Sequence, residues 1–365
     1  MIHQNRKLLS FILTAAVFWG TLFACILPVR AQSAGQVKIT SIDSTAFPTM
    51  NVQFEAYDAQ GQFVQTLTAA TLSLYENELE QPVQSLELRN PGVQFTLAVN
   101  GGPELVRLYA GQPRFDAIFQ NLGDWVMHQP AKTNDLFSLA ASNSLALIRS
   151  GDPQQWASAI NSLAEIDFQQ ATPGLEEITA AVDLATDPST QSNMKRAILW
   201  ITPLFTPENI ASLQNLGDRA AQQGVALNIW VTASQSNADA APDVYAALQS
   251  MAAATGGQVT LFSGAESLPD IETYLNPLRY FYQASYQSAA NTSGAVEIVL
   301  QASGADLEAQ SPVKAADLTI SAPSPIFIAP RTTIERAWVV PAGGREETLT
   351  PASIQYSIVI EFPDG

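Results

Sequence analysis

The feature that most constrains the fold of this chain is a regular alternation, over residues 93–280, of uniformly apolar runs with amphipathic segments. The apolar runs lack polar alternation, which is typical of strands buried on both faces of a parallel sheet. The segments between them repeat apolar residues every three to four positions, as helices do. The strand candidates are Phe95–Val99, Leu136–Ala140, Ala197–Ile201, Val225–Val231 and Gln258–Phe262. This pattern predicts an α/β fold with a doubly wound, mostly parallel, Rossmann-like sheet.

Local sequence signals mark the ends of two of the predicted helices. Thr206-Pro207 pairs an N-cap residue with a first-turn proline, and Gly224 stands where a C-terminal glycine cap is expected. Thr172-Pro173 offers the same N-terminal pair for a helix over residues 173–186. Glu176-Glu177 lies on that helix, and adjacent helical side chains point in different directions, so we expect a solvated face rather than a paired catalytic dyad.

The segments on either side of this region have a β pattern. Residues 36–92 alternate apolar and polar side chains between Gly, Asn and Pro turns, which predicts a small β-sandwich-like domain. Residues 281–322 predict a β-hairpin extension, and residues 323–365 predict the start of a further, incomplete β domain. The expected organisation is therefore an α/β domain over residues 93–280, flanked by β-sandwich-like modules.

The first 31 residues predict export. Arg6 and Lys7 precede an apolar run over residues 8–29, and Val29-Arg30-Ala31 fits a small-x-small cleavage site. The run is longer than the core of most signal peptides, so residues 1–31 are either a signal peptide or an N-terminal membrane anchor. Both alternatives predict an extracellular or cell-envelope protein, which contacts a membrane only through residues 8–29.

The composition excludes several classes of function. A net charge of -17 argues against a nucleic-acid partner, because phosphate binding needs a basic surface. The single cysteine, Cys25, lies in the export segment, and only His3 and His128 could supply an imidazole. A metal site of His and Cys, or a nucleophile activated by histidine, therefore cannot be assembled without His128, which we expect at a solvated helix end. The chain is predicted not to be an enzyme.

The loop that follows the first strand is the candidate binding loop. Asn100-Gly101-Gly102-Pro103-Glu104 leaves the carboxyl end of that strand, which is where α/β sheets bind ligands. Pro103 removes an amide donor that a bound phosphate would use, and the Gly pattern of a dinucleotide site is missing. The loop therefore predicts recognition of something other than a nucleotide.

Several phrases of the sequence resemble the von Willebrand factor type A (VWA) domain of bacterial secreted proteins. Met251–Gly257, "MAAATGG", is similar to the family's helix ending ahead of the last strand. Residues 196–205 and 224–234, "RAILWITPLF" and "GVALNIWVTAS", are similar to its central strands. The resemblance covers roughly residues 90–285, and "LSLYENELEQPVQSLEL" and "YFYQASYQS" resemble its flanking β segments. It implies a VWA fold with an ion site, called MIDAS, at the loop described above.

The resemblance also implies that this ion site is degenerate. Asn100 stands where the family has its first Asp, and Gly102 and Glu104 replace two serines. Thr172 matches the loop threonine, and Thr202-Pro203 replaces a Thr-Asp pair. Hard divalent cations need oxygen ligands, and most of those oxygens are missing here. We therefore expect no metal and no other cofactor, with an altered cation site through Glu104 as the alternative.

These observations predict a non-enzymatic, extracytoplasmic binding, adhesion or assembly protein. Its expected site is the carboxyl edge of the sheet, around Asn100–Glu104, Thr172 and residues 202–204, and its expected partner is an unidentified protein bound without an ion. One alternative is a purely structural spacer of a surface assembly. Another is an α/β hydrolase whose Asp, Glu and Ser residues form an unrecognised site.

Overall fold

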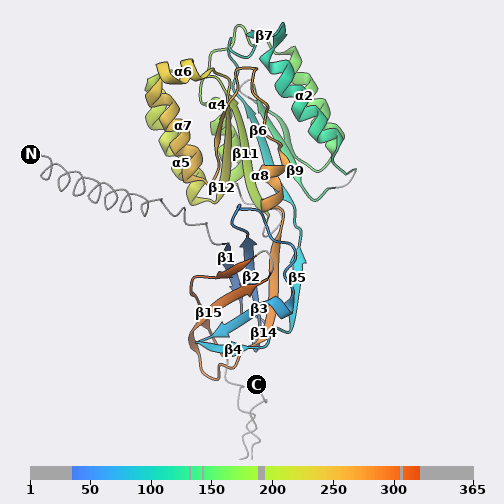
Figure 1. The fold of residues 1–365 in the computed structure, drawn as a ribbon, viewed down its shortest axis with the longest axis vertical. Helices are drawn as coiled ribbons and strands as arrows, with labels where there is room; N and C mark the ends of the chain where they lie inside the picture. Colours follow the sequence, from blue (N-terminus) through green and yellow to red (C-terminus); the bar gives the residue numbers. More distant parts are fainter. Residues whose placement is uncertain (1–34, 131–132, 142–143, 188–193, 305–306, 321–365) are drawn as a thin grey trace, which may run out of the picture.

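The chain forms two lobes, an α/β lobe and a smaller β-sandwich lobe (Figure 1). The computed structural model describes residues 35–130, 133–141, 144–187, 194–304 and 307–320. No helix within these ranges has the length and hydropathy to cross a membrane. The predicted export segment, residues 1–31, and the expected further domain, residues 323–365, lie outside the described residues.

A six-stranded sheet forms the centre of the α/β lobe, in the order β10-β9-β6-β11-β12-β13. Its strands are β6 (Val93–Val99), β9 (Leu136–Ala141), β10 (Ser144–Ser150), β11 (Lys195–Thr202), β12 (Val225–Val231) and β13 (Val259–Leu261). Neighbouring strands are parallel except β10, which pairs antiparallel with β9. The predicted doubly wound, mostly parallel sheet is confirmed. β10 was not predicted, because its apolar run, Leu145–Ile148, is only four residues long and periodicity alone does not assign so short a run.

Helices cover both faces of this sheet (Figure 1). α2 (Arg114–Met127), α3 (Pro153–Ser162) and α8 (Glu272–Leu275) pack on one face, and α4 (Glu176–Thr186), α5 (Ile210–Gln222) and α7 (Pro242–Ala254) pack on the other. A short helix, α6 (Gln235–Ala240), precedes α7. Successive strand residues point to opposite faces, so Phe95, Leu97 and Val99 face α2 and α3, whereas Ala98 faces α4.

The observed helix boundaries are compared with the predicted end signals for α5 and for α4. Gly224 follows α5 with a φ of 65°, so the C-terminal signal is confirmed; Thr206 precedes only the 3-10 turn that Pro207 opens ahead of α5, and its side chain makes no capping hydrogen bond. α4, however, begins at Glu176 rather than at residue 173, so the expected N-cap role of Thr172 is wrong. Glu177 is only 6% exposed, so the expectation of a solvated face is wrong for this residue.

The second lobe is a sandwich of two antiparallel sheets. One sheet has the order β1 (Gln36–Asp43), β2 (Thr49–Tyr57), β14 (Phe281–Gln287), β5 (Ser85–Arg89). The other contains β16 (Glu308–Gln310), β15 (Gly294–Ser303), β3 (Leu72–Glu76) and β4 (Leu79–Gln81), and β17 (Lys314–Leu318) also pairs with β15. Alternate residues of both sheets, such as Val52 and Phe54 on β2 and Leu74 on β3, form its core.

This sandwich is built from both ends of the described chain. β14 lies between β2 and β5, whereas β15 pairs with β3 in the opposite sheet. The first two strands after residue 280, β14 and β15, therefore do not form the hairpin extension expected over residues 281–322. They complete the domain begun by residues 36–92, because an alternating pattern reveals which face of a strand is buried but not which strand is its neighbour. The α/β lobe is inserted between β5 and β14.

Buried charges connect the two lobes. Lys195, at the start of β11, places its Nζ 3.1 Å from Glu55 Oε1 and 3.0 Å from the hydroxyl of Tyr57, both on β2. Lys195 and Glu55 are only 19% and 14% exposed, so these contacts hold the lobes together within a largely dry junction.

Candidate functional site

The predicted site residues gather where the parallel strands end, an edge we call the rim. The rim comprises residues 100–113 after β6, residues 171–175 before α4, residues 202–206 at the end of β11, and residues 232–234 and 262–268 after β12 and β13. Asn100 N donates to Ile201 O at 2.9 Å and so extends the β6–β11 ladder by one bond. Because the strands are parallel and in register, the ladder brings Asn100 and Thr202 together.

Asn100 is the centre of a closed hydrogen-bond network. Its side chain is buried, and Nδ2 donates to Gly174 O and to Thr202 Oγ1, both at 2.9 Å. Its Oδ1 accepts from Gly174 N at 3.1 Å, and Thr202 Oγ1 donates to Pro203 O at 2.8 Å. Both donors of the amide and its acceptor oxygen are therefore engaged by protein groups. The network needs no cation to satisfy it.

Gly102 is packed between two prolines. A Cβ atom on Gly102 would lie 2.8 Å from Pro203 Cγ and 2.9 Å from Pro173 Cγ, which is too close for ordinary packing. Gly101 is similarly close to Ala171, because a Cβ there would lie 2.7 Å from the alanine methyl. The loop has no room for the serine that the VWA resemblance assigns to position 102, and Pro203 supplies a ring rather than a carboxylate.

Glu104 is neutralised by arginines. Its Oε2 lies 2.6 Å from Arg114 Nη1, and its Oε1 lies 3.1 Å from Arg107 Nη1. Arg114 is buried at the first position of α2, where Nε also donates to Ser263 O at 2.8 Å and Nη1 to Thr232 O at 3.3 Å. The rim therefore contains an internal guanidinium cation, held by carbonyl groups and by the one carboxylate that an altered metal site would need.

Sequence reasoning found most of the positions but missed two of their partners. Thr172 is exposed, and the network around Asn100 does not include its hydroxyl. Gly174 was missed because the pattern carries no signal for a backbone group in a loop. Arg114 was missed although a signal exists, since a cation in the first turn of a helix opposes the helix dipole and needs a specific partner.

The donors at the rim do not fit a hard divalent cation. Such an ion needs about six oxygen ligands, including carboxylates that offset its charge. Asn100 offers an amide oxygen that already accepts from a backbone amide, and Glu104 is bound to two guanidinium groups. Across the described part of the chain, no three His, Cys, Asp or Glu side chains are grouped closely enough to hold a metal.

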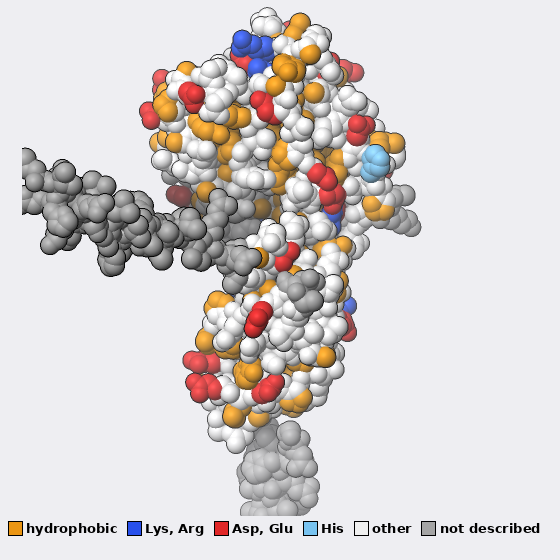
Figure 2. Space-filling view, in the orientation of Figure 1, with side chains coloured by type: hydrophobic (Ala, Val, Ile, Leu, Met, Phe, Trp, Pro, Cys, Tyr) orange, Lys and Arg blue, Asp and Glu red, His pale blue; other side chains and the backbone are white. Residues whose placement is uncertain are grey.

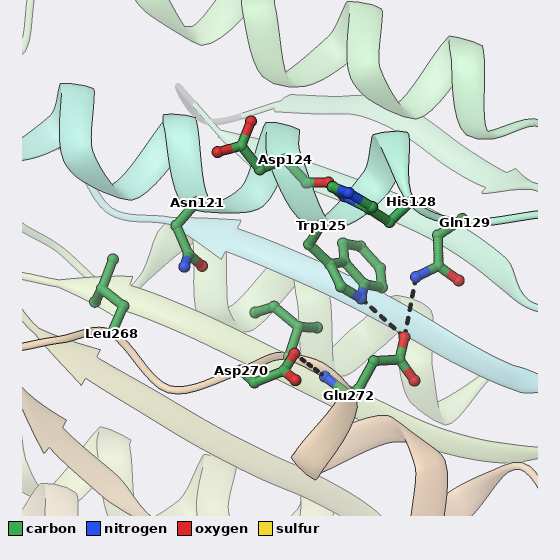
Figure 3. A pocket seen from close by; sticks show the side chains of 9 residues that line it. Asn121, Asp124, Trp125, His128, Gln129, Leu268, Asp270 and Glu272 are labelled. Carbon is green, nitrogen blue, oxygen red and sulfur yellow. Dashed lines mark hydrogen bonds between the residues drawn. The ribbon is translucent and has the colours of Figure 1, made fainter.

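A separate pocket of about 580 Å³ lies between the C-terminal half of α2 and residues 268–272 (Figure 3). Its wall includes Trp125, whose Nε1 donates to Glu272 Oε1 at 2.9 Å. Burial alone would raise the pKa of Glu272, but hydrogen bonds from Arg279 and Trp125 and the charge of Arg279 lower it. His128 caps the exposed end of α2, with Nδ1 2.6 Å from Asp124 O, so the expected helix-end histidine is confirmed.

Three solved structures illustrate the similarity of this chain to known folds. An aerotolerance-related membrane protein from Bacteroides fragilis is 15% identical, with 51% of this chain and 98% of that chain covered and a TM-score of 0.36. The SpRpn10 VWA domain is 15% identical, with 51% and 93% covered and a TM-score of 0.36. The manganese-loaded TRAP protein of Plasmodium vivax is 10% identical, with 63% and 96% covered and a TM-score of 0.38.

No protein-family profile matches the sequence, and no curated protein matches it either. At the identities and TM-scores of these three structures, the similarity assigns no function to this chain. The function has to be inferred from the side chains at the rim.

Proposed function

We propose that this chain is a non-enzymatic, extracytoplasmic protein of the binding, adhesion or assembly kind. Its VWA-like lobe binds a protein partner at the rim without a bridging metal ion. The observation that carries the proposal is the closed network of Asn100, in which the whole side-chain amide is bound to Gly174 and Thr202.

The energetics of the rim support metal independence. A cation that recruited Asn100 Oδ1 would break its bond with Gly174 N, and each such bond contributes about 0.5–1.5 kcal/mol. Recruiting Glu104 would separate it from Arg114, a buried guanidinium that would then be left without its charged partner at a cost of about 3–5 kcal/mol. A divalent ion would also be repelled by that guanidinium.

The surroundings of His128 and Glu272 support the non-enzymatic part. His128 is exposed, and its Nδ1 contacts the carbonyl of Asp124 in its own helix. Glu272, the most enclosed carboxylate of the 580 Å³ pocket, is ion-paired with Arg279. A carboxyl whose pKa is lowered by an arginine has no proton to donate as a general acid at neutral pH, and it is a weaker general base than an unpaired carboxylate.

The extracytoplasmic part rests on the sequence. The basic and apolar pattern of residues 1–31 predicts export, and the net charge of -17 opposes binding to nucleic acid. A membrane contact is proposed only through residues 8–29.

The metal-independent part is tested by calorimetric titration of the chain with Mg²⁺ and Mn²⁺, together with thermal unfolding at millimolar concentrations of each ion. We expect no heat of binding and no rise in Tm, because an ion that binds only the folded state must stabilise it. Binding that disappears in Glu104→Gln would support the altered cation site instead. The binding role is tested by capture of envelope and extracellular-matrix proteins in EDTA, and no captured partner would favour the structural spacer.

A further inference from the structure

A small hairpin stands at the outer end of the rim, within the loop between β6 and α2. β7 (Leu108–Tyr109) and β8 (Gln112–Pro113) pair antiparallel, and Ala110 and Gly111 connect them. The φ angles of these two connecting residues are 49° and 84°, as a two-residue type I′ turn requires. The hairpin is at the top of the α/β lobe, at the end remote from the sandwich (Figure 1).

The hairpin exposes large apolar side chains. Leu108 is 63% exposed and Tyr109 is 48% exposed, next to Arg107, whose side chain is 59% exposed. Figure 2 shows basic and hydrophobic side chains gathered at this end of the molecule. Tyrosine and arginine are enriched among the central contact residues of protein interfaces, and the exposed leucine adds apolar surface to them.

The hairpin is also held in one conformation. Arg114 N donates to Arg107 O at 3.1 Å, and Phe115 N donates to Leu105 O at 3.0 Å, so its base is tied to the start of α2. Tyr109 rests against Gly264, where a Cβ atom would lie 2.5 Å from the tyrosine Cβ. A rigid element loses little conformational entropy when it binds, which favours recognition by this hairpin.

The charges around the hairpin indicate what it recognises. Arg107 shares Glu104 with Arg114, so one carboxylate serves two guanidinium groups. The other nearby carboxylate, Glu266, accepts from the backbone amide and the hydroxyl of Ser263. These two arginines and two glutamates give no net charge at the rim, whereas the whole chain has a net charge of -17. An acidic partner is repelled by most of this protein and can approach Arg107.

We propose that the hairpin is the contact element of the rim, and that it recognises a protein segment in which an Asp or Glu carboxylate adjoins apolar side chains. Arg107 binds the carboxylate, and Leu108 and Tyr109 cover the apolar neighbours. This inference rests on the proposed binding function and names the chemistry of its partner.

The test is a selection of displayed random peptides on the immobilised full chain, in EDTA, with counter-selection on the double variant Leu108→Ser/Tyr109→Ser. We expect the enriched peptides to carry an acidic residue next to aromatic or aliphatic residues. Affinity for a selected peptide should fall about 30-fold in Tyr109→Ala, as for a central interface residue. It should fall about 10-fold in Arg107→Gln, and raised salt should weaken the wild-type complex and not the variant complex.

Matched controls lie in the sandwich lobe. Leu79 is 66% exposed and Arg89 has a 51% exposed side chain, so Leu79→Ser and Arg89→Gln change leucine and arginine at exposures similar to those of Leu108 and Arg107. Both controls should bind selected peptides as the wild type does. Enrichment of peptides without acidic residues, or no enrichment at all, would overturn the proposal.

Two other occupants of the hairpin are distinguished by further measurements. Self-association seen by sedimentation and abolished by Tyr109→Ala would assign the hairpin to a second copy of this chain. Flotation with vesicles of anionic phospholipid that depends on Arg107 would assign it to a membrane. Either result would overturn the proposal while leaving the metal titration, and with it the metal-independent rim, unaffected.

Discussion

Asn100→Asp restores the carboxylate that the VWA resemblance assigns to this position, and it tests whether the rim is a latent ion site. Asn100 Nδ2 donates to Gly174 O and Thr202 Oγ1, both at 2.9 Å. The substitution replaces that donor with an acceptor. Loss of the donor to a buried carbonyl costs about 1–3 kcal/mol, and the buried negative charge adds to this cost. Thr202 can turn its hydroxyl toward the new carboxylate and recover about 1 kcal/mol. We expect a net loss of about 2–4 kcal/mol.

Urea denaturation followed by tryptophan fluorescence measures this loss. The tryptophans in the described ranges, Trp125, Trp156, Trp200 and Trp230, all lie in the α/β lobe, so their emission reports the unfolding of that lobe. Asn215→Asp on the exposed face of α5 is the matched control, with an expected change within about 0.5 kcal/mol. Burial raises the pKa of the new carboxyl group, so the penalty should shrink as the pH falls and the protonated group becomes a donor again.

The stability of Asn100→Asp in Mg²⁺ distinguishes a latent ion site from a rim that cannot hold a cation. If the rim cannot hold a cation, 10 mM Mg²⁺ leaves the stability of Asn100→Asp unchanged. If the substitution completed a site with a Kd of about 0.1 mM, that concentration would add about 2.7 kcal/mol. Such a gain, absent from the wild type, would refute the inference that the packing of the loop excludes an ion.

Three further substitutions test other contacts. Lys195→Met leaves Glu55 in the junction without its charged partner and should cost about 3 kcal/mol in urea denaturation, and adding Glu55→Gln should recover part of it. A loss below about 0.5 kcal/mol would show that the pair is solvated. Glu272 has a lowered pKa, so its contribution to the free energy of unfolding is complete above pH 4.5 and is lost as the pH falls below that value. Glu272→Gln should therefore make the stability depend less on pH below pH 4.5. An unchanged pH profile would contradict this. Gly102→Ser should cost about 1–3 kcal/mol through its clash with two prolines, whereas Gly304→Ser, with open space around it, should be neutral by thermal unfolding.

The sequence predicted most of the α/β sheet because burial on both faces leaves a direct trace. β6 is buried at all seven positions, and its sequence is correspondingly apolar apart from Gln94 and Thr96. β10 left no such trace, because it lies at the edge of the sheet and its apolar run is only four residues long. The pairing of β14 with β2 and β5 could not be predicted either, because it depends on contacts between segments about 200 residues apart.

The sequence predicted which positions form the candidate site but not the contacts that their side chains make. The resemblance placed Asn100, Gly102 and Pro203 at one rim, and the structure brings them together. The contacts of these side chains were not predicted, because the partners of Asn100 and Glu104 are a backbone group of Gly174 and the guanidinium of Arg114. Sequence patterns record side-chain types, whereas these contacts depend on the course of the loops.

The insertion of the α/β lobe between β5 and β14 imposes an order on folding. During synthesis, β2 and β5 emerge long before the strand that lies between them, so the first sheet stays open until β14 is made. Folding of the α/β lobe brings the end of β5 close to the start of β14, and this shortens the loop that the sandwich must close. The sandwich is therefore expected to be the last part of the described chain to fold, and damage to the α/β lobe should leave it with an unpaired, aggregation-prone edge.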